Sequence, residues 1–546
     1  MKKIAFVFVF LVCELAQPFV PEVWGQRKET GFDVSRNLEV FSNIFRTLDM
    51  YYVDTLSADT MMRWAIDGML MEIDPYTVYY PDEENEALTQ MMEGRYAGIG
   101  AMIRYYKRLD RCAIEEPYEG SPALEFGLKA GDVILSIDGK DTRGMRTSQV
   151  SRMLRGDAGT VFEVTVQRQG VEEPLSLKIT RRQIQIPSIP WYGIVDKEQG
   201  VGYLALTSVT DRVAQDVRHA VTQMQREGMK RLVLDLRDNP GGSVVEAVEI
   251  VGMFVPKGTL VVSTRGKLSS TCYDYKTPSE PIDSLLPLTV MVNENSASAA
   301  EIISGALQDL DRATIYGQRT YGKGLVQAVR EVPYRGELKI TTAKYYIPSG
   351  RCIQAYDFRH RTADGAATTL PDSLTQEFRT SKGRVVRDGG GILPDSLLAT
   401  DTLPTIVYDL VASDVFFEYV THYAATHSEI AAPGLFRLTD AEYAEFVDTV
   451  SHADFTYNDR TLTALAQVRK IAEVEGQLEP NREAFEALEK GLKDKNLARD
   501  LQHFRSQIQP YVETAIVCRY YYQGGALRQQ LESDKEFQRV LGRHYL

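Results

Sequence analysis

Residues 288–309 read LTVMVNENSASAAEIISGALQD, and this stretch decides the fold of the middle of the chain. The apolar run Leu288–Val292 predicts a buried strand, and Ala299–Gln308 has the pattern of a helix. Small residues surround Ser296 and Ser298 at the turn between them, so a serine there is exposed and a substrate backbone can approach it. The helix start adds free N–H groups and the positive end of the helix dipole. The stretch therefore predicts a serine site on an α/β layer.

Strands and helices alternate on both sides of this stretch. The patterns predict a strand, a helix, a strand, a helix and a strand in turn, at 202–206, 213–225, 231–236, 244–254 and 259–263. Such alternation favours an α/β layer with a largely parallel sheet. The segment 355–390 is polar and rich in Gly, Asp and Thr, which predicts a surface insertion.

A serine alone is a weak nucleophile and needs a base. None of the seven histidines has a spacing that suggests a Ser-His-Asp arrangement. Lys323 is the alternative base, because burial can lower the pKa of a lysine and leave it neutral. Gly322 and Gly324 flank it and permit close packing. Gln327 lies four residues further on, a spacing that shares a face in a strand and in a helix. We therefore expect Lys323 and Gln327 to point to the same place.

A nucleotide-binding loop is the competing interpretation of the same segment. Residues 317–323 read GQRTYGK and match the spacing of such a loop. However, Gly324 stands where a Ser or Thr should bind magnesium, and residues 325–329 have the pattern of a strand instead of a helix.

The cysteines show no CxxC pair and no zinc spacing. The sequence therefore predicts no cofactor and no metal site.

The charge balance excludes one class of partner. Lys plus Arg is 62 and Asp plus Glu is 75 among 546 residues, which gives a net charge of −13. Non-specific nucleic-acid binding needs a basic face, so no nucleic-acid partner is expected. Apolar residues make up 44% and charged residues 25%, as in soluble globular proteins, and the length allows roughly three to four domains.

The first 26 residues have the pattern of a secretory signal. The basic start Lys2-Lys3 precedes the apolar run 4–13, and Gly25 is a small residue of the kind found at a signal-peptide cleavage site. The apolar run is about half of the roughly 20 residues that a membrane span needs. We therefore expect a signal peptide over 1–25, cleavage near Gly25 and export to the periplasm, in the cell envelope.

Helical patterns dominate both ends of the chain that remains after this cleavage. Between 26 and 94, apolar side chains recur on one helical face, at Leu38, Phe41, Ile44, Phe45, Leu48 and Tyr52. This stripe predicts a core in an all-helical cap or dimerisation element. After Thr405 the chain is charged and amphipathic, and Thr439 with Glu442 has the spacing of a capping box. This part predicts a helical accessory domain.

Residues 95–182 change to short strands separated by glycine turns. Three stretches carry this pattern: GIGA at 98–101, GSPA at 120–123 and LKAGDVILSIDG at 128–139. The region resembles a PDZ domain of the bacterial protease-associated type. Such a domain binds an extended peptide as an added strand and holds its terminal carboxylate with backbone N–H groups of a glycine-rich loop. The resemblance implies that this loop is formed by Gly98, Ile99, Gly100 and Ala101. The other interpretation is that its glycines serve only a tight turn.

Four runs of the chain together resemble one protein family. They are DLRDNPGG at 235–242, ENSASAAEIISGALQD at 294–309, RATIYGQRTYGKGLVQ at 312–327 and KYYIPSGRCIQ at 344–354. They are similar to the carboxyl-terminal processing, or tail-specific, proteases, which are Ser-Lys serine peptidases with a PDZ domain. The resemblance implies a multidomain α+β protein with a crotonase-like (ClpP/crotonase-type) α/β core. The implied domains are an N-terminal helical domain, an inserted PDZ domain, the protease core and a C-terminal helical accessory domain, at 26–94, 95–182, 183–400 and 401–546.

The resemblance also assigns roles residue by residue. Ser298 would be the nucleophile in preference to Ser296, because the family's motif places it directly before the helix. Lys323 would be the general base and Gln327 would orient it. The oxyanion hole would be formed by the backbone N–H groups of Gly242 and Ala299. Such donors are worth roughly 3–4 kcal/mol of barrier in proteases generally.

The implied function is a serine endopeptidase. It would bind protein C-terminal tails through the PDZ domain and cleave them through the Ser-Lys dyad and an acyl-enzyme. Two alternatives stay open: a catalytically inactive PDZ scaffold that only binds peptides, and a carrier of small apolar ligands on the same fold. The expected partners are protein or peptide substrates with free C-termini. The sequence leaves an adaptor protein and a homodimer open as further partners.

Overall fold

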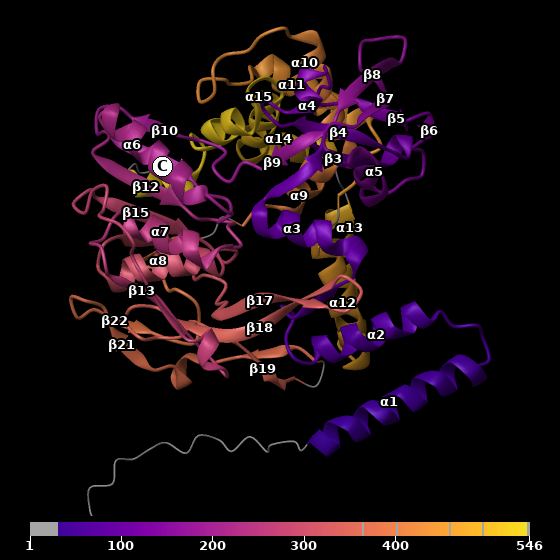
Figure 1. The fold of residues 1–546 in the computed structure, drawn as a ribbon. Coiled ribbons are helices and arrows are strands. Elements are labelled where there is room, and N and C mark those ends of the chain that lie inside the picture. The colour runs from indigo at the N-terminus through magenta and orange to yellow at the C-terminus, as the bar shows by residue number, and fades with distance from the viewer. Residues whose placement is uncertain (1–30, 363–364, 400–401, 458–459, 494–495, 543–546) are drawn as a thin grey trace, which may run out of the picture. The chain divides into compact units, whose positions relative to one another are not determined.

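The computed structural model describes residues 31–362, 365–399, 402–457, 460–493 and 496–542 (Figure 1). The predicted signal peptide over 1–25 lies outside the described residues. The chain divides into two compact units, Met1–Glu72 and Ile73–Leu546. Its architecture is mixed α/β with many helices. None of the described helices is both long enough and apolar enough to cross a membrane.

The first unit, where the structure describes it, consists of α1 (Gly31–Tyr51) and α2 (Ala58–Met71). Ser57 caps α2 by accepting a hydrogen bond from the backbone N–H of Thr60. The two helices are as predicted, but the prediction that the apolar stripe of α1 forms a core is wrong. Leu38 and Ile44 are 64% and 56% exposed. The two described helices of this unit offer too little surface to bury such a stripe.

The second unit begins with a strand. β1 (Val78–Tyr80) pairs antiparallel with β18 (Gly336–Tyr346). The sequence predicts a helical domain over 26–94 and no strand within it; the β-branched and aromatic side chains of Val-Tyr-Tyr suit a strand once β18 offers a partner. Two short elements follow, η1 (Asp82–Glu84) and α3 (Asn85–Glu93). Gly94 ends α3 with a φ of 66°, a conformation that glycine adopts without strain.

The predicted short strands with glycine turns are confirmed between 95 and 185. β2 (Arg95–Gly98) pairs with β9 (Arg182–Gln185), and the larger sheet has the order β3-β4-β5-β7-β8 with β6 paired to β5. Its elements are β3 (Ala101–Tyr106), η2 (Lys107–Leu109), β4 (Arg111–Pro117), α4 (Pro122–Glu125), β5 (Val133–Ile137), β6 (Lys140–Asp141), α5 (Thr147–Leu154), β7 (Val161–Gln167) and β8 (Leu175–Thr180). Ile114, Ile134 and Val164 are fully buried in the cluster between them.

A six-stranded sheet with the order β10-β11-β12-β15-β16-β23 forms the centre of the next region. Its strands are β10 (Tyr192–Asp196), β11 (Val201–Ala205), β12 (Arg231–Asp235), β15 (Leu288–Val292), β16 (Thr314–Gly317) and β23 (Ser396–Leu397). All neighbours from β11 to β23 are parallel, and only β10 is antiparallel, so the predicted largely parallel sheet is confirmed. Because parallel strands end at the same edge, the loops that follow β11, β12, β15 and β16 meet there.

Helices cover one face of this sheet. They are α6 (Val213–Arg226), α7 (Val244–Gly252) and α8 (Ala299–Asp309), and the predicted helices at these places are confirmed (Figure 1). Alternate strand residues such as Leu234 and Val290 are fully buried in the same cluster as residues of these helices.

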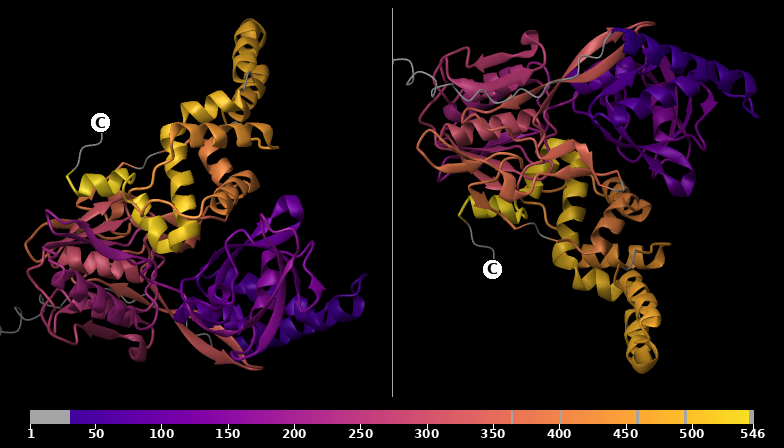
Figure 2. Two further views of the ribbon diagram at one scale, coloured as in Figure 1. Left: turned by 90° about the horizontal axis from the view of Figure 1, so that it is seen from above. Right: turned by 90° about the horizontal axis from the view of Figure 1, so that it is seen from below.

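The end of the chain covers the opposite face of the sheet. Phe537 packs with Tyr203 at a ring-centroid distance of 5.1 Å, and Val233 and Met291 belong to the same buried cluster. Figure 2 shows this yellow C-terminal segment against the magenta strands from two further sides. Burial on both faces explains why the strands are continuous apolar runs.

A second sheet has the order β1-β18-β13-β14, and β17 pairs with β18. Its further elements are β13 (Leu260–Gly266), η3 (Ser269–Thr271), β14 (Tyr273–Lys276) and β17 (Leu325–Val332). The polar segment 355–390 forms small hairpins, with β19 (Tyr356–Arg361), β20 (Ala367–Thr369), η4 (Asp372–Leu374), β21 (Glu377–Arg379) and β22 (Val385–Arg387).

Helices make up the described chain after Thr405, as predicted. They are α9 (Thr405–Ala412), α10 (Asp414–Thr426), α11 (Asp440–His452), α12 (Arg460–Val474), η5 (Glu479–Asn481), α13 (Arg482–Lys493), α14 (Leu497–His503), α15 (Arg505–Gln530) and α16 (Lys535–Val540). The predicted capping box starts α11, where the N–H of Glu442 donates to Thr439 Oγ1 (3.3 Å) and the N–H of Thr439 donates to Glu442 Oε2 (2.7 Å).

Two of these helices hold the β-structure of residues 95–185. Arg104 on β3 and Arg519 on α15 lie over the ring of Phe417 on α10, at 4.7 and 5.1 Å from its centroid. Arg519 also donates a hydrogen bond to the carbonyl of Glu115 on β4 (2.8 Å). Cation–π contacts are each worth about 0.5–2 kcal/mol, with the higher values for desolvated pairs.

A partly buried ion network joins α16 to the central sheet. Arg237 follows β12 and pairs with Asp235 (2.6 Å), with Asp534 (2.6 Å) and with Glu536 on α16 (3.1 Å). Burial opposes the charge of Arg237, but the carboxylates around it hold its pKa well above the usual value. The hydroxyl of Tyr203 donates a further hydrogen bond to Asp235 (2.8 Å).

We expect Phe537→Ala to destabilise the central sheet, because the change leaves a cavity in the cluster on its second face. The free energy of unfolding should fall by about 3–5 kcal/mol. Urea unfolding followed by tryptophan emission measures it, since Trp191 packs against this cluster. Val474→Ala is the matched control, because Val474 is 89% exposed on α12, and it should cost less than about 0.5 kcal/mol. Equal stability of Phe537→Ala and the wild type would contradict a structural role of the last helix.

Candidate active site

Ser298 lies at the turn between β15 and α8, directly before the helix. Its φ of 55° places a non-glycine residue in the left-handed region, a strained conformation that is found at functional sites. Ser296 is fully buried, and its hydroxyl donates to the carbonyl of Leu236 (2.7 Å). Ser298 is only partly buried. The structure thus leaves Ser298, and not Ser296, open to a substrate.

One buried carboxylate joins the segment of Ser298 to the segment of Lys323. Oε2 of Glu301 accepts hydrogen bonds from the backbone N–H groups of Ser298 (2.8 Å) and Lys323 (2.9 Å). Oε1 accepts from the N–H of Gly322 (2.7 Å) and the hydroxyl of Thr320 (2.6 Å). Burial raises the pKa of Glu301, and these four donors act against the rise. Both oxygens are thus fully used in fixing two loops that are distant in the sequence.

Tyr345 forms a second link between the same two segments. Its hydroxyl on β18 lies 2.7 Å from the carbonyl oxygen of Lys323 and 3.2 Å from that of Ser298. Tyr345 is 1% exposed, and burial raises its pKa well above the usual value. A permanently protonated hydroxyl is the donor that two neighbouring carbonyl groups require.

The Gly241-Gly242 turn lies against the start of α8. Both residues have positive φ, 97° and 145°, and a Cβ on Gly241 would lie 2.7 Å from the backbone nitrogen of Ala299, so the close approach requires glycine. The N–H of Gly241 is used by Asn239 Oδ1 (2.8 Å). Within the described part of the chain, the N–H groups of Gly242 and Ala299 donate to no protein acceptor. Two free donors beside a serine are what an oxyanion needs.

Lys323 lies directly before β17, with its ammonium group near an aromatic ring. Nζ is 4.6 Å from the ring centroid of Tyr76, and no hydrogen bond among the described residues joins it to the hydroxyl of Ser298. Burial, with a smaller contribution from the like charge of Lys339, lowers the pKa of Lys323 to about 8. Catalytic hydrogen bonds in structures without substrate are often long or absent and form in the complex.

Gln327 lies on β17, where it pairs with Thr341 next to an irregularity in the register with β18. Its amide nitrogen donates to Thr341 Oγ1 (3.1 Å), and the N–H of Thr341 donates to Thr77 Oγ1 (3.2 Å). Among the described residues, no hydrogen bond joins Gln327 to Lys323. The expectation that their side chains point to the same place stays a prediction.

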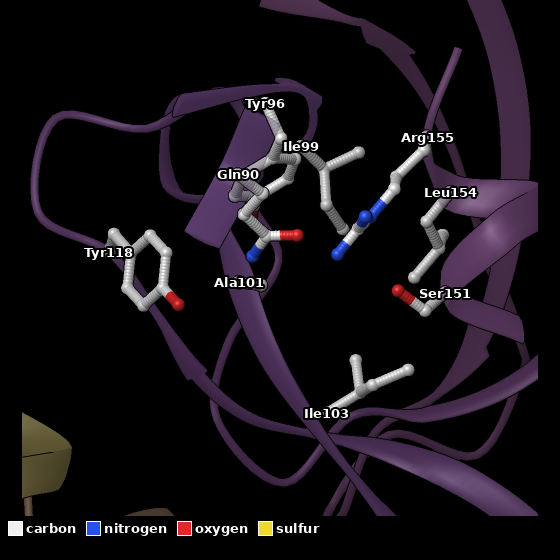
Figure 3. Close-up of a pocket in the computed structure, with 9 residues that line it drawn as sticks. All are labelled: Gln90, Tyr96, Ile99, Ala101, Ile103, Tyr118, Ser151, Leu154 and Arg155. Carbon is white, nitrogen blue, oxygen red and sulfur yellow. The ribbon is translucent and has the colours of Figure 1, made fainter. Parts of the chain in front are cut away.

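A pocket opens between the β2–β3 loop and α5 (Figure 3). Ile99 and Ala101 of the predicted carboxylate loop belong to its lining, together with Gln90, Tyr96, Ile103, Tyr118, Ser151, Leu154 and Arg155. Gly98 is paired with Arg182 in the β2–β9 ladder. Gly100 has a φ of 73°, and a Cβ there would collide with the side chain of Ser121 (2.5 Å), so the loop needs glycine.

Tyr96 occupies part of this pocket. Burial raises its pKa to about 12, while the guanidinium of Arg155 and the backbone N–H groups of Gly100 and Ala101 act against the rise. These N–H groups belong to the loop that the sequence predicts for a terminal carboxylate.

Sequence reasoning does not find Glu301 or Tyr76. The spacing Ser298-x-x-Glu301 is that of a capping box and is a usable signal for Glu301. Nothing in the sequence links Tyr76 to Lys323, because the contact is purely tertiary. Among the described residues, no three His, Cys, Asp or Glu side chains are grouped so as to hold a metal ion.

Three family models match the chain. "Peptidase family S41" matches residues 200–360, "PDZ domain" matches 114–168, and "Probable PDZ-protease, C-terminal helical domain" matches 406–541. The first range contains Gly242, Ser298, Ala299, Lys323 and Gln327. The second begins after the loop 98–101.

Known proteins are similar over a large part of the chain. A "Carboxy-terminal-processing protease" of Bartonella bacilliformis is 34% identical over 323 residues, which are 58% of this chain and 73% of that protein. A "Probable CtpA-like serine protease" of Staphylococcus aureus is 35% identical over 322 residues, which are 58% of this chain and 62% of that protein. Among solved structures, a photosystem II D1 C-terminal processing protease is 27% identical with a TM-score of 0.36, covering 67% of this chain and 94% of that chain. The chain belongs to the carboxy-terminal-processing protease family of serine-type peptidases, with a PDZ domain.

Proposed function

We propose that the protein is a serine endopeptidase that binds protein C-terminal tails through its PDZ domain and cleaves them with the dyad of Ser298 and Lys323. One observation carries the proposal: Glu301 binds the backbone N–H groups of both residues. This carboxylate fixes the backbone of a serine and the backbone of a lysine whose side chain has a lowered pKa. The N–H groups of Gly242 and Ala299, which donate to no protein acceptor among the described residues, support the proposal as donors for an oxyanion.

The chemistry follows from these positions. Neutral Lys323 takes the proton of Ser298 Oγ as this oxygen attacks the peptide carbonyl, and the oxyanion accepts hydrogen bonds from Gly242 and Ala299. The protonated lysine then gives its proton to the leaving amine, and an acyl-enzyme remains. Water, deprotonated by the same lysine, releases the product. In this proposal the Lys323 side chain moves from the Tyr76 ring to Ser298, and Gln327 orients it.

Tail binding is assigned to the pocket of residues 95–185. The terminal carboxylate would bind the N–H groups of the loop Gly98-Ile99-Gly100-Ala101, beside the ring of Tyr96 in the pocket. The apolar side chains of Ile99, Ile103 and Leu154 in the pocket favour an apolar terminal residue.

The proposal includes a cellular location, a domain arrangement and candidate partners. The signal pattern of residues 1–25 supports export to the periplasm with cleavage near Gly25. The parallel sheet with helices on it supports a crotonase-like core over 183–400, flanked by the domains 26–94, 95–182 and 401–546. An adaptor protein and a homodimer are candidate partners, which co-purification and sedimentation would test.

Ser298→Ala and Lys323→Ala test the dyad. We expect each change to lower the cleavage rate of an unfolded protein with a free apolar C-terminus by more than about 10³-fold, because the nucleophile and its base act as a unit. Affinity of the same tail peptide for the protein, measured by fluorescence anisotropy, is the control and should not change. Full activity of either variant contradicts the dyad. A wild type that binds tails, cleaves nothing and resists serine-reactive probes would instead be a peptide-binding scaffold.

The pKa of Lys323 predicts the pH dependence. Since the neutral form is the base, kcat/KM should rise with pH through a midpoint near 8. Lys339→Met removes the like charge that helps to lower this pKa, so the midpoint should move to higher pH. Lys344→Met, at an exposed position of the same strand, is the matched control and should leave the midpoint unchanged. A midpoint that Lys339→Met leaves in place contradicts Lys323 as the titrating base.

Glu301→Gln tests the carboxylate link. The amide can accept at one atom only, so donors among the four are left unpaired in a buried place, at about 1–3 kcal/mol each. We expect kcat to fall by about 10²-fold or more while KM changes little, together with slower labelling of Ser298 by a small phosphonate. Glu513→Gln is the control, since Glu513 is a buried carboxylate of the helical domain that accepts from Leu438 N–H and Gln509. It should lower thermal stability and leave kcat unchanged. Equal kcat losses in both variants would contradict a positioning role of Glu301.

A further inference from the structure

Four aromatic side chains from three segments meet beside Lys323. Tyr76 comes from the loop before β1, Tyr321 from the loop before β17, and Tyr356 and Phe358 from β19; we call these four residues the aromatic cluster. The ring centroids of Tyr76 and Phe358 are 5.7 Å apart, those of Tyr356 and Phe358 6.2 Å, and those of Tyr321 and Tyr356 5.4 Å. The hydroxyls of Tyr76 and Tyr321 lie 3.3 Å apart.

The backbone fixes this cluster to the loop of the base. The N–H of Ala355, directly before β19, donates to the carbonyl of Gly322 (2.9 Å), and Gln354 Oε1 accepts from the N–H of Gly324 (2.8 Å). The start of β19 is therefore held on both sides of Lys323. Tyr356 and Phe358, two residues apart, share one face of the strand, as their stacked rings show.

The cluster is not a closed core. Tyr321 is 37% exposed, and Tyr76, Tyr356 and Phe358 are partly exposed. Large aromatic side chains with open faces beside a reaction centre are available for contact with a ligand, and such rings dominate recognition energetics.

We infer that the aromatic cluster is the subsite for the first residue on the C-terminal side of the cleaved bond, and that it selects a large apolar or aromatic side chain. The inference rests on the proposed function. Because the base returns its proton to the leaving amine, the nitrogen of that residue must come to Lys323 Nζ. Before the lysine moves to Ser298, the ring of Tyr76 lies 4.6 Å from Nζ, so a side chain on the residue whose nitrogen meets Nζ can take the ring face that the lysine leaves.

The charges around the cluster select against ionised side chains. The like charge of Lys339 lowers the pKa of Lys323, so a further cation beside Lys323 would be repelled by Lys339. The nearby carboxylates are already used: Glu301 by its four donors, and Asp74 by the N–H groups of Tyr76 (2.8 Å) and Thr77 (2.7 Å). An anionic side chain would lose hydration against aromatic faces without a partner aimed at it. A neutral apolar side chain bears none of these costs.

Internally quenched peptides with one common C-terminal tail test the subsite. They differ only in the residue after the cleaved bond, which is Phe, Leu, Ala, Lys or Asp. For the wild type we expect kcat/KM with Phe or Leu to exceed that with Ala by about 10-fold, and Lys and Asp to be no better than Ala. Phe358→Ala and Tyr356→Ala should reduce the Phe-to-Ala ratio to about 1–2, with less than a threefold change for the Ala peptide. Phe358→Leu should retain most of the ratio.

Arg359→Ala is the matched control on the same strand. Its exposed side chain pairs with Asp357 and is not part of the cluster, so the Phe-to-Ala ratio should stay as in the wild type. A wild type that cleaves all five peptides equally, or prefers Lys, overturns the subsite and leaves the peptidase proposal standing. An equal loss on all peptides in Phe358→Ala, with Phe358→Leu giving the same loss, also overturns the subsite. Cleavage of none of the peptides, or of any protein, would overturn the proposed function and the subsite with it.

Discussion

The buried carboxylate of Glu301 is the constraint on which the candidate site depends. A charge in the interior costs several kcal/mol unless hydrogen bonds replace its hydration. At Glu301 these donors come from the turn of Ser298 and from the loop 320–323, which follow two different strands of the sheet. Neither loop can move alone without leaving the carboxylate short of donors. The distance between the serine and the lysine backbones is thus set by the need to solvate one charge.

The candidate site also depends on the parallel sheet, because the loops that carry it follow the strands of this sheet. Helix α16 covers one face of the sheet. Asn239 in the turn after β12 accepts from the N–H of Ala297 (2.9 Å), which ties this turn to the segment of Ser298. Arg237, two residues earlier, is held by carboxylates of the last helix. The last helix of the segment after Thr405 therefore packs on the central sheet. Phe417 and Arg519, earlier in the same segment, attach it to the PDZ region.

The sequence predicts those features that local patterns determine. The strand Leu288–Val292, the helix after Ser298 and the capping box of Thr439 follow from periodicity and from short-range hydrogen bonding, and the structure confirms them. It fails where a tertiary contact decides. The strand β1 forms because β18 offers a partner, and the stripe of α1 stays exposed in the described chain. The proximity of Tyr76 to Lys323 depends on the packing of distant loops, and no local pattern contains it.

The environment of Lys323 combines two opposing effects whose magnitudes can be compared. A ring near Nζ favours the charged lysine by about 0.5–2 kcal/mol. A pKa of about 8 instead of 10.5 corresponds to about 3 kcal/mol in favour of the neutral form, so burial, with the charge of Lys339, outweighs the ring. A side chain that enters the aromatic cluster would bury Nζ further and take the face of Tyr76 from it. Both changes favour the neutral base, so occupation of this subsite would by itself prepare Lys323 for the proton of Ser298.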